Sequence, residues 1–361
     1  MFQKKTIRDV EVKGQIVLVR TDYNVPLYED EEGNVQVASD FRVRESLPTI
    51  NYLLENEARK VILISHLGRP EGKDEKLSLR PVVEILAENL PGRAIGFVED
   101  TDMEQVALAI EEAPEGSVTL LENLRFSPEE KANSEELARE LVTATGATLF
   151  VQDGFAVTHR AQASTVAVTK LLPAVAGLLV EKEVTMLRSA LEDPEHPLVV
   201  VIGGAKVADK QSLIDKFLPV ADRIIVGGKI AADGYSSEHS QIYVAEDFDM
   251  NRAGEKLDVG PVSTAKIVDM VMGAKTVVWN GTLGKVEDVA YATGSTIVAK
   301  VLGESENVTS IICGGDTSGF VENLAAEDAS LHYSLVSTGG GAALALLAGE
   351  EMPGLEALED K

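Results

Sequence analysis

The sequence predicts an α/β protein built on two doubly wound, mostly parallel sheets. Short apolar runs recur along the chain, segments with helical spacing separate several of them, and most runs break abruptly into a polar or glycine-bearing loop. This alternation of strand and helix is typical of parallel sheets. The chain has 361 residues, more than one hydrophobic core usually supports, so two domains are expected.

In the first half of the chain, apolar runs predict strands at residues 16–20, 61–64, 118–121 and 148–151. Residues 47–54 have the spacing of a helix. A second helix is expected to begin at Asn133 or Ser134, because acidic residues follow directly, and to reach Ala144.

Basic side chains gather near the ends of these predicted strands. All but one lie just beyond a strand's carboxyl end, and the set is Arg20, Arg42, His66, Arg69, Arg125 and Arg160, with Arg42 the exception. The carboxyl ends of parallel strands share one edge of a sheet, where ligands bind. A surface ion pair would explain any one of these arginines. Taken as a set, in a chain of net charge −26, they favour an anion site.

The second half repeats the pattern after a predicted connector helix. Residues 177–191 have the apolar spacing of a buried helix, and two X-Pro pairs then break the chain. Strands are predicted at residues 198–202, 223–226, 241–245, 276–279, 309–312 and 334–336. Most of these run into glycine loops, which let backbone donors converge on a phosphate.

The segment LVVVIGGAKVADK, at residues 198–210, has two interpretations. A buried strand breaks into Gly203-Gly204, and in a following helix Lys206 and Lys210 would share one face. That arrangement suits a polyphosphate. The alternative is an ordinary turn between strand and helix, with the lysines in solvent.

Neither a G-x-x-x-x-G-K-[ST] nor a G-x-G-x-x-G motif occurs, so a Walker loop and a dinucleotide fingerprint are both absent. A nicotinamide-dependent dehydrogenase is therefore disfavoured. Asp316 lies inside a glycine loop and is the candidate to hold Mg²⁺ through phosphate and water. The alternative role for Asp316 is a turn or a helix cap before Thr317.

Composition excludes several classes of protein. The chain has 33 basic and 59 acidic residues, which argues against binding nucleic acid or an anionic membrane. A single cysteine, Cys313, fits a reducing compartment and is expected to be a core residue at a strand end. The sequence has no apolar signal region and no run long enough to span a membrane. A cytoplasmic protein is expected.

The functional prediction depends on a series of motifs. They are VLVRTDYNVP (17–26), SHLGRP (65–70), LLENLRF (120–126), GGAKVADK (203–210), DVGP (258–261), WNGTLGKVE (279–287), GGDT (314–317) and STGGGA (337–342). In number and order they resemble the phosphoglycerate kinase family over nearly the whole chain. The resemblance implies reversible, Mg²⁺-dependent phosphoryl transfer between 1,3-bisphosphoglycerate and ADP, giving 3-phosphoglycerate and ATP in glycolysis and gluconeogenesis.

The resemblance also implies two Rossmann-like domains in a monomer that closes about a hinge. The phosphoglycerate-binding domain would span residues 1–176 and the connector helix residues 177–192. The nucleotide-binding domain would span residues 193–336. The hinge and a C-terminal segment, at residues 337–361, would pack toward the N-terminal domain.

Site residues follow motif by motif from this resemblance. Phosphoglycerate would be held by Asp22, Asn24, Arg42, His66, Arg69, Arg125 and Arg160. The nucleotide would be held by Gly204, Ala205, Lys206, Lys210, Gly227, Gly228, Asn280, Glu287, Gly315, Asp316 and Thr317, with Glu287 on the ribose and Asp316 on the metal. Transfer would be catalysed by Arg42, Lys206, Lys210, Gly339, Gly340 and Gly341.

Some positions depart from the family pattern. The segment between Gly228 and Asp258 is short, Lys229 replaces a common third glycine, and Lys285 stands in place of an apolar residue. Gln162 replaces a usual second histidine. These changes bear on nucleotide preference and turnover, and the alternative to an active enzyme is a ligand-binding or regulatory protein of the same fold.

Overall fold

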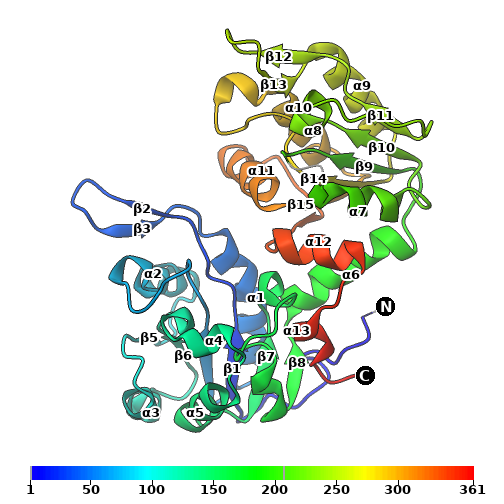
Figure 1. Ribbon diagram of the computed structural model, residues 1–361. Coiled ribbons are helices and arrows are strands. Elements are labelled where there is room, and N and C mark those ends of the chain that lie inside the picture. Colours follow the sequence, from blue (N-terminus) through cyan, green and yellow to red (C-terminus); the bar gives the residue numbers. More distant parts are fainter. Residues whose placement is uncertain (1, 206–207) are drawn as a thin grey trace. The chain divides into compact units, whose positions relative to one another are not determined.

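The computed structural model of the chain describes residues 2–205 and 208–361, which divide into two compact units (Figure 1). Unit 1 runs as far as Lys182 and also contains Met352–Lys361, and unit 2 comprises Glu183–Glu351. The division falls within helix α6 (Leu178–Glu192), inside the range expected for the connector. The finer domain limits at residues 192, 336 and 337 stay predictions.

Unit 1 contains a six-stranded parallel sheet in the order β5-β6-β4-β1-β7-β8. Its strands are β1 (Ile16–Arg20), β4 (Lys60–Ile64), β5 (Ile95–Val98), β6 (Ser117–Leu121), β7 (Leu149–Gln152) and β8 (Ala174–Ala176). Every residue of β4 is buried. The four strands expected in this half are confirmed to within a residue, and the two edge strands β5 and β8 were not predicted.

The connections of unit 1 include helices α1 (Phe41–Glu55), α2 (Arg80–Asn89), α3 (Met103–Glu112), α4 (Pro128–Lys131) and α5 (Glu135–Thr145), the short helical turns η1 (Glu75–Leu77), η2 (Leu124–Phe126), η3 (Phe155–Val157) and η4 (Ala167–Lys170), and the hairpin β2 (Leu27–Glu29) and β3 (Val35–Val37). Helix α5 begins after Ser134, whose Oγ accepts a hydrogen bond from the Leu137 N–H at 3.3 Å. It ends at Gly146, which has a left-handed φ of 61°. The helix start predicted at Asn133 or Ser134 is therefore confirmed.

The C-terminal segment returns to unit 1, as predicted. After α13 (Pro353–Glu356), the Glu359 N–H donates to Ala174 O at 3.0 Å, beside β8. Lys4 and Asp360 form an antiparallel bridge, and the Gly354 N–H donates to Thr158 O at 2.8 Å. Residues from both ends of the chain therefore cover one edge of the same sheet.

Unit 2 contains a second six-stranded parallel sheet, in the order β11-β10-β9-β14-β15-β16. Its strands are β9 (Leu198–Ile202), β10 (Arg223–Val226), β11 (Ile242–Val244), β14 (Thr276–Asn280), β15 (Thr309–Cys313) and β16 (Leu335–Val336). The six strands expected in this half are confirmed. Cys313 ends β15 fully buried, and burial raises the pKa of its thiol to about 11, so it is a core residue as expected.

The connections of unit 2 include helices α7 (Ala208–Phe217), α8 (Gly228–Ala232), α9 (Pro261–Met272), α10 (Thr293–Gly303), α11 (Gly315–Glu327) and α12 (Gly340–Ala348), the turn η5 (Val289–Tyr291), and the antiparallel hairpin β12 (Phe248–Met250) and β13 (Lys256–Val259). Both sheets are doubly wound and parallel, which confirms the predicted fold class. Among the described residues, no helix combines the length and the apolar character needed to cross a bilayer.

Asp258 joins β13 to the start of α10. Its carboxylate is 2% exposed and accepts hydrogen bonds from the N–H groups of Val259 and Gly294, each at 2.9 Å. A Cβ on Gly284 or Gly294 would lie 2.2 or 2.9 Å from an oxygen of this carboxylate, so both glycines are required for its close approach. Burial raises the pKa of Asp258 to about 6.

This raised pKa predicts a pH dependence of stability. The folded state binds the Asp258 proton more tightly than the unfolded state, whose carboxyl pKa is near 3.8. The contribution of Asp258 to the free energy of unfolding is therefore largest below pH ~4 and is lost as the pH rises through about 6. The wild type should lose stability over this window relative to Asp258→Asn. Urea unfolding at stepped pH, followed by the fluorescence of the single tryptophan, Trp279, measures the difference, and parallel profiles would contradict the prediction.

Candidate functional site

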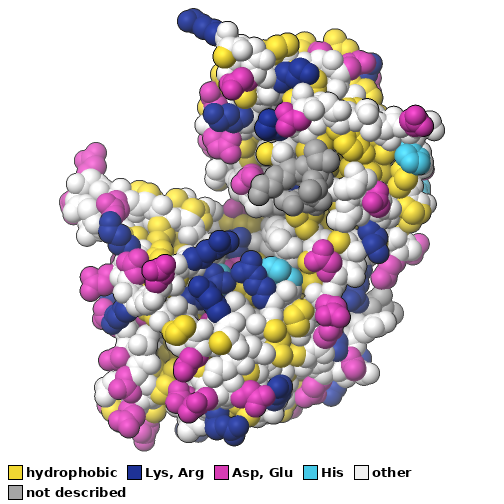
Figure 2. All heavy atoms as spheres, in the orientation of Figure 1, with side chains coloured by type: hydrophobic (Ala, Val, Ile, Leu, Met, Phe, Trp, Pro, Cys, Tyr) yellow, Lys and Arg dark blue, Asp and Glu magenta, His cyan; other side chains and the backbone are white. Residues whose placement is uncertain are grey.

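The carboxyl ends of the central strands of unit 1 carry a group of basic side chains that we call the arginine cluster. It consists of Arg20 at the end of β1, Arg42 in the first turn of α1, Arg69 after β4, Arg125 in η2, Arg160 after η3, and His66. Figure 2 shows Lys and Arg side chains gathered beside a histidine on one face of this unit, although the chain as a whole is strongly acidic. The expected concentration of positive charge at one sheet edge is present.

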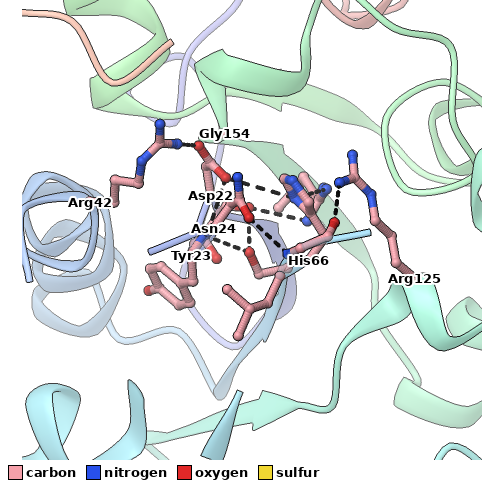
Figure 3. Close-up of polar contacts among 12 residues, drawn as sticks. Asp22, Tyr23, Asn24, Arg42, His66, Arg125 and Gly154 are labelled. Atoms are coloured by element: carbon pink, nitrogen blue, oxygen red, sulfur yellow. Dashed lines mark hydrogen bonds and ion pairs between the residues drawn. The ribbon is translucent and has the colours of Figure 1, made fainter. Parts of the chain in front are cut away.

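Asp22 and Asn24 lie at the centre of the cluster (Figure 3). Asp22 forms an ion pair with Arg42, and its Oδ1 lies 3.7 Å from Nδ1 of His66. The Oδ1 of Asn24 accepts a hydrogen bond from the Gly68 N–H at 2.8 Å. Figure 3 shows Arg42 and Arg125 on opposite sides of this group. The loops after β1 and β4 are thus joined directly.

The cluster has a buried floor and an exposed rim. Arg20 is fully buried, and its Nη2 lies 3.1 Å from Nδ1 of His66. Arg125 is 5% exposed and donates from Nη1 to Gly68 O at 2.8 Å. Asn24, Arg69 and Arg160 are exposed. The floor therefore holds its shape through fixed contacts, while the rim presents donors to solvent.

The pKa values of His66 and Arg125 are shifted by the charges of the other residues in the cluster. Burial, followed by the charges of Arg20, Arg125, Arg42 and Arg160, holds the pKa of His66 well below its usual value, so this imidazole is neutral at pH 7. Burial, followed by Arg20 and Arg160, lowers the pKa of Arg125 to about 10. The positive charge of the site thus resides on the guanidinium groups, which can bind carboxylate or phosphate in a bidentate manner.

Glu130 is a residue that sequence reasoning missed. Its carboxylate is completely buried and accepts hydrogen bonds from Ser164 N at 3.0 Å and Ser164 Oγ at 2.6 Å. Its charge opposes the lowering of the pKa of both Arg20 and Arg125. In the sequence, Glu130 is one of several acidic residues in a short polar segment, and nothing marks it as buried.

In unit 2, the loops after β9, β10 and β14 pack backbone against backbone. The Gly203 N–H donates to Asn280 O at 3.0 Å, and the Gly204 N–H donates to Thr282 O at 2.9 Å. A Cβ on Gly281 would lie 2.2 Å from Gly203 O, and one on Gly228 would lie 2.6 Å from Thr282 O. These glycines are needed for loop packing, whereas the glycine-bearing loops were predicted to direct backbone donors at a phosphate.

Lys210 lies beneath these loops. It is 9% exposed, and its Nζ donates to Oδ1 of Asn280, which is fully buried and donates from Nδ2 to Sγ of Cys313 at 3.2 Å. Lys206, expected to follow the transferring phosphoryl group, lies outside the described residues. Thr317 is also buried, and its Oγ1 accepts from the Gly281 N–H at 2.9 Å.

The ends of β15 and β16 bring two helix N-termini together. A Cβ on Gly340, at the start of α12, would lie 2.6 Å from Gly315 N at the start of α11. Paired helix N-termini favour anions, because their first N–H groups have no partner within the helix. The preceding Ser337 and Thr338 are held by Glu183, a completely buried carboxylate that accepts from Thr338 N at 3.0 Å and Thr338 Oγ1 at 2.6 Å.

A cavity of about 220 Å³ opens among these loops, and we call it the unit 2 cavity. It is lined by Gly204, Ala205, Lys229, Lys256, Leu257, Thr282, Gly284, Lys285, Glu287 and Asp316. Among the predicted nucleotide residues, Gly204, Ala205, Glu287 and Asp316 line it directly, whereas Gly227, Gly228, Asn280 and Thr317 are buried. Lys229, Lys256, Leu257, Gly284 and Lys285 line it without having been predicted.

The residues present fit a magnesium ion carried by a nucleotide. Among the described residues, no group of three or more His, Cys, Asp or Glu side chains could hold a metal ion by itself. Asp316 is exposed in the first turn of α11 and faces the cavity. Mg²⁺ commonly takes one or two carboxylates and completes its shell with phosphate and water, so one carboxylate at this place suffices.

Comparison with known proteins identifies the relatives of this chain. The family model described as phosphoglycerate kinase matches residues 7–242 and 232–350. Phosphoglycerate kinase of Aquifex aeolicus is 39% identical over 407 residues, covering 100% of both chains. Phosphoglycerate kinase of Dictyoglomus turgidum is 38% identical, covering 99% of this chain and 100% of the relative. Since these alignments exceed the length of this chain, the relatives have residues with no counterpart here.

Solved structures give the same result. Phosphoglycerate kinase from Pyrococcus horikoshii superposes with a TM-score of 0.84 at 28% identity, covering 99% of this chain and 98% of that one. Phosphoglycerate kinase from Coxiella burnetii superposes with a TM-score of 0.76 at 31% identity, covering 98% of each chain. The likeness therefore extends over both units.

The backbone packing of the loops predicts the effect of adding one methyl group. Gly281→Ala places a Cβ against Gly203 at a φ of +98°, and we expect it to lower the free energy of unfolding by roughly 4 kcal/mol. Gly254→Ala is the matched control in the same unit, because its φ is +81° but no atom lies within 4 Å of the new Cβ. This control should cost about 1 kcal/mol. Equal losses in urea unfolding would show that backbone conformation, rather than loop contact, explains the stability lost by Gly281→Ala.

Proposed function

This chain belongs to the phosphoglycerate kinase family, and from that premise we propose that the arginine cluster binds the phosphoglycerate while the unit 2 cavity binds the nucleotide. The chain is a kinase with phosphoglycerate kinase activity, a phosphotransferase that uses a carboxyl group as acceptor, as its motifs predicted. The observation that supports the assignment of sites is the convergence of four guanidinium charges, those of Arg20, Arg42, Arg125 and Arg160, on His66, which lies beside Asp22.

In unit 1, the proposed ligand residues are Asp22, Asn24, Arg42, His66, Arg69, Arg125 and Arg160. Phosphoglycerate carries a phosphate and a carboxylate, and each matches the planar fork of an arginine. Arg69 and Arg160 on the exposed rim would meet the ligand first, and the buried floor would fix its orientation. Neutral His66 would contribute a hydrogen bond rather than a charge.

In unit 2, the N-termini of α11 and α12, together with Lys210, would hold the nucleotide phosphates. Gly204, Ala205, Gly227, Gly228 and Gly315 would shape the pocket, with Asn280 and Thr317 supporting it from below. Glu287 would accept a hydrogen bond from the ribose. Asp316 would hold Mg²⁺, which neutralises phosphate charge when it is bound.

Transfer between a carboxylate and a nucleotide phosphate needs alignment and charge neutralisation more than a base. We assign that neutralisation to Arg42, Lys206 and Lys210, with backbone donors at Gly339, Gly340 and Gly341. Direct transfer requires the two substrates to meet with water excluded, so the proposal includes closure about a hinge in a monomeric, cytoplasmic enzyme. Scattering in solution with and without both substrates tests the closure and the monomer together.

The assignment of activity is tested by coupling 3-phosphoglycerate and MgATP to glyceraldehyde-phosphate dehydrogenase and following NADH oxidation. Turnover that depends on both substrates and on Mg²⁺ is expected. If both ligands bind in calorimetry but turnover is absent, the chain is instead a ligand-binding protein of this fold.

Lys206→Ala gives a sharper test of the proposed transfer residues. Removing one charge that acts on the moving phosphoryl group should lower kcat about 100-fold. The dissociation constant for 3-phosphoglycerate should stay within about twofold, because that ligand is assigned to unit 1. Lys216→Ala is the control, since Lys216 is exposed in the last turn of α7. Equal losses in kcat and in 3-phosphoglycerate binding would remove the transition-state role.

A further inference from the structure

One end of the unit 2 cavity is lined by lysines that the proposed function does not use. Lys229, Lys256 and Lys285 all contribute to its wall. Phosphate binding has been assigned to the opposite end, where Asp316 and the helix N-termini lie. The lysines therefore face a different part of the bound nucleotide.

Sheet order establishes that the two ends are separate. Helix α11, which carries Asp316, follows β15, whereas α8, which carries Lys229, follows β10 (Figure 1). Strands β9 and β14 lie between them. Neighbouring strands are about 4.8 Å apart, so the two helices begin roughly 14 Å from each other. That is comparable to the distance from the phosphates of a nucleotide to its base.

Lys285 and Lys256 lie at the end of the unit 2 cavity nearest α8, which we call the α8 end. The Lys285 N–H donates to Leu257 O at 2.8 Å, so the two chain segments are directly joined. Strand β13, which carries Lys256 and Leu257, packs against α8. The buried Asp258 carboxylate packs closely against the adjacent Gly284. The backbone that presents Lys285 is thus held on two sides.

The three amines are not equivalent. Nζ of Lys229 forms an ion pair with Asp233 at 2.8 Å. Nζ of Lys256 donates to Ala232 O at 3.3 Å and lies 4.6 Å from the centre of the Phe248 ring. Within the described part of the chain, the Lys285 amine has no hydrogen-bond or ion-pair partner. Lys285 is therefore the lysine free to contact a ligand at this end.

The chemistry of lysine discriminates between bases. A lysine amine only donates hydrogen bonds. Adenine presents its own donor at the 6-amino group, next to the N7 acceptor, whereas guanine and hypoxanthine present two adjacent acceptors, O6 and N7, which one lysine can bind together. Leu257 offers an apolar contact for a purine ring at the same end. The α8 end of the cavity thus matches a 6-oxopurine better than adenine.

We propose that Lys285, supported by Lys229 and Lys256, makes this pocket prefer 6-oxopurine nucleotides, those of guanine and hypoxanthine, over adenine nucleotides. The inference rests on the proposed placement of the nucleotide in the unit 2 cavity. The inference goes beyond that placement because it names Lys285 as the residue that recognises the base.

Equilibrium binding tests the preference without requiring turnover. Calorimetry with IDP, GDP and ADP in the presence of Mg²⁺ should give dissociation constants for IDP and GDP at least about tenfold lower than for ADP. The bases of IDP and ADP differ mainly at position 6. The ratio of their dissociation constants therefore isolates the contact between Lys285 and the base. A dissociation constant for ADP equal to or below that for IDP would overturn the proposal.

Variants separate a contact to the base from a contact to the phosphates. Lys285→Met should weaken IDP and GDP binding about tenfold and leave ADP within about twofold, because the lost donor faces O6 and N7. Lys300→Met, on the exposed face of α10, is the matched control and should leave the dissociation constants for IDP, GDP and ADP unchanged. Equal weakening of IDP and ADP by Lys285→Met would mean that this lysine acts on the phosphates, and the proposal would be wrong.

The coupled assay with MgATP and MgITP distinguishes this failure from failure of the proposed function. Turnover with both nucleotides at equal kcat/KM would preserve the assignment of the cavity and overturn the base preference. If no nucleotide binds or turns over, the assignment of the unit 2 cavity falls, and the base preference falls with it.

Discussion

Repulsion between buried guanidinium groups is the constraint on which unit 1 depends. Arg20 and Arg125 are buried close enough for their charges to lower the pKa of Arg125. An isolated buried charge is costly, so the fold must supply counter-charge from within. The buried Glu130 does this from beneath, and Asp22 does it beside Arg42. In the proposed function, the remaining excess of positive charge would attract an anion, and binding of that anion would relieve the repulsion.

Unit 2 meets a different constraint, because its loops must approach one another without side chains between them. Gly203, Gly228 and Gly281 allow backbone to meet backbone, so the glycine-rich motifs first build a rigid platform. In the proposed function, the donors for an anion would come instead from the helix N-termini that follow β15 and β16. The two units thus use opposite means, concentrated side-chain charge in one and backbone dipoles in the other.

The sequence could predict what depends on local pattern. The buried central strands and the gathering of basic residues at their ends follow from runs of apolar residues and from the shared edge of a parallel sheet. The edge strands β5 and β8 were missed, since they are short and β5 is mostly half-buried. The roles of Glu130 and Asp258 depend on contacts with Ser164 and Gly294. These partners are distant in the sequence, so no local pattern predicts the contacts.

The return of Met352–Lys361 to unit 1 has a consequence for biosynthesis. On the ribosome, a domain usually folds once its own residues have emerged. Here all of Glu183–Glu351 is translated before the segment that pairs with β8 and with Lys4 appears. The nascent unit 1 must therefore wait with that sheet edge only partly covered, by the N-terminal segment that pairs with Ala176, and exposed edges invite pairing with other chains. Unit 2 has no such dependence, so it can complete its fold first although its sequence begins second.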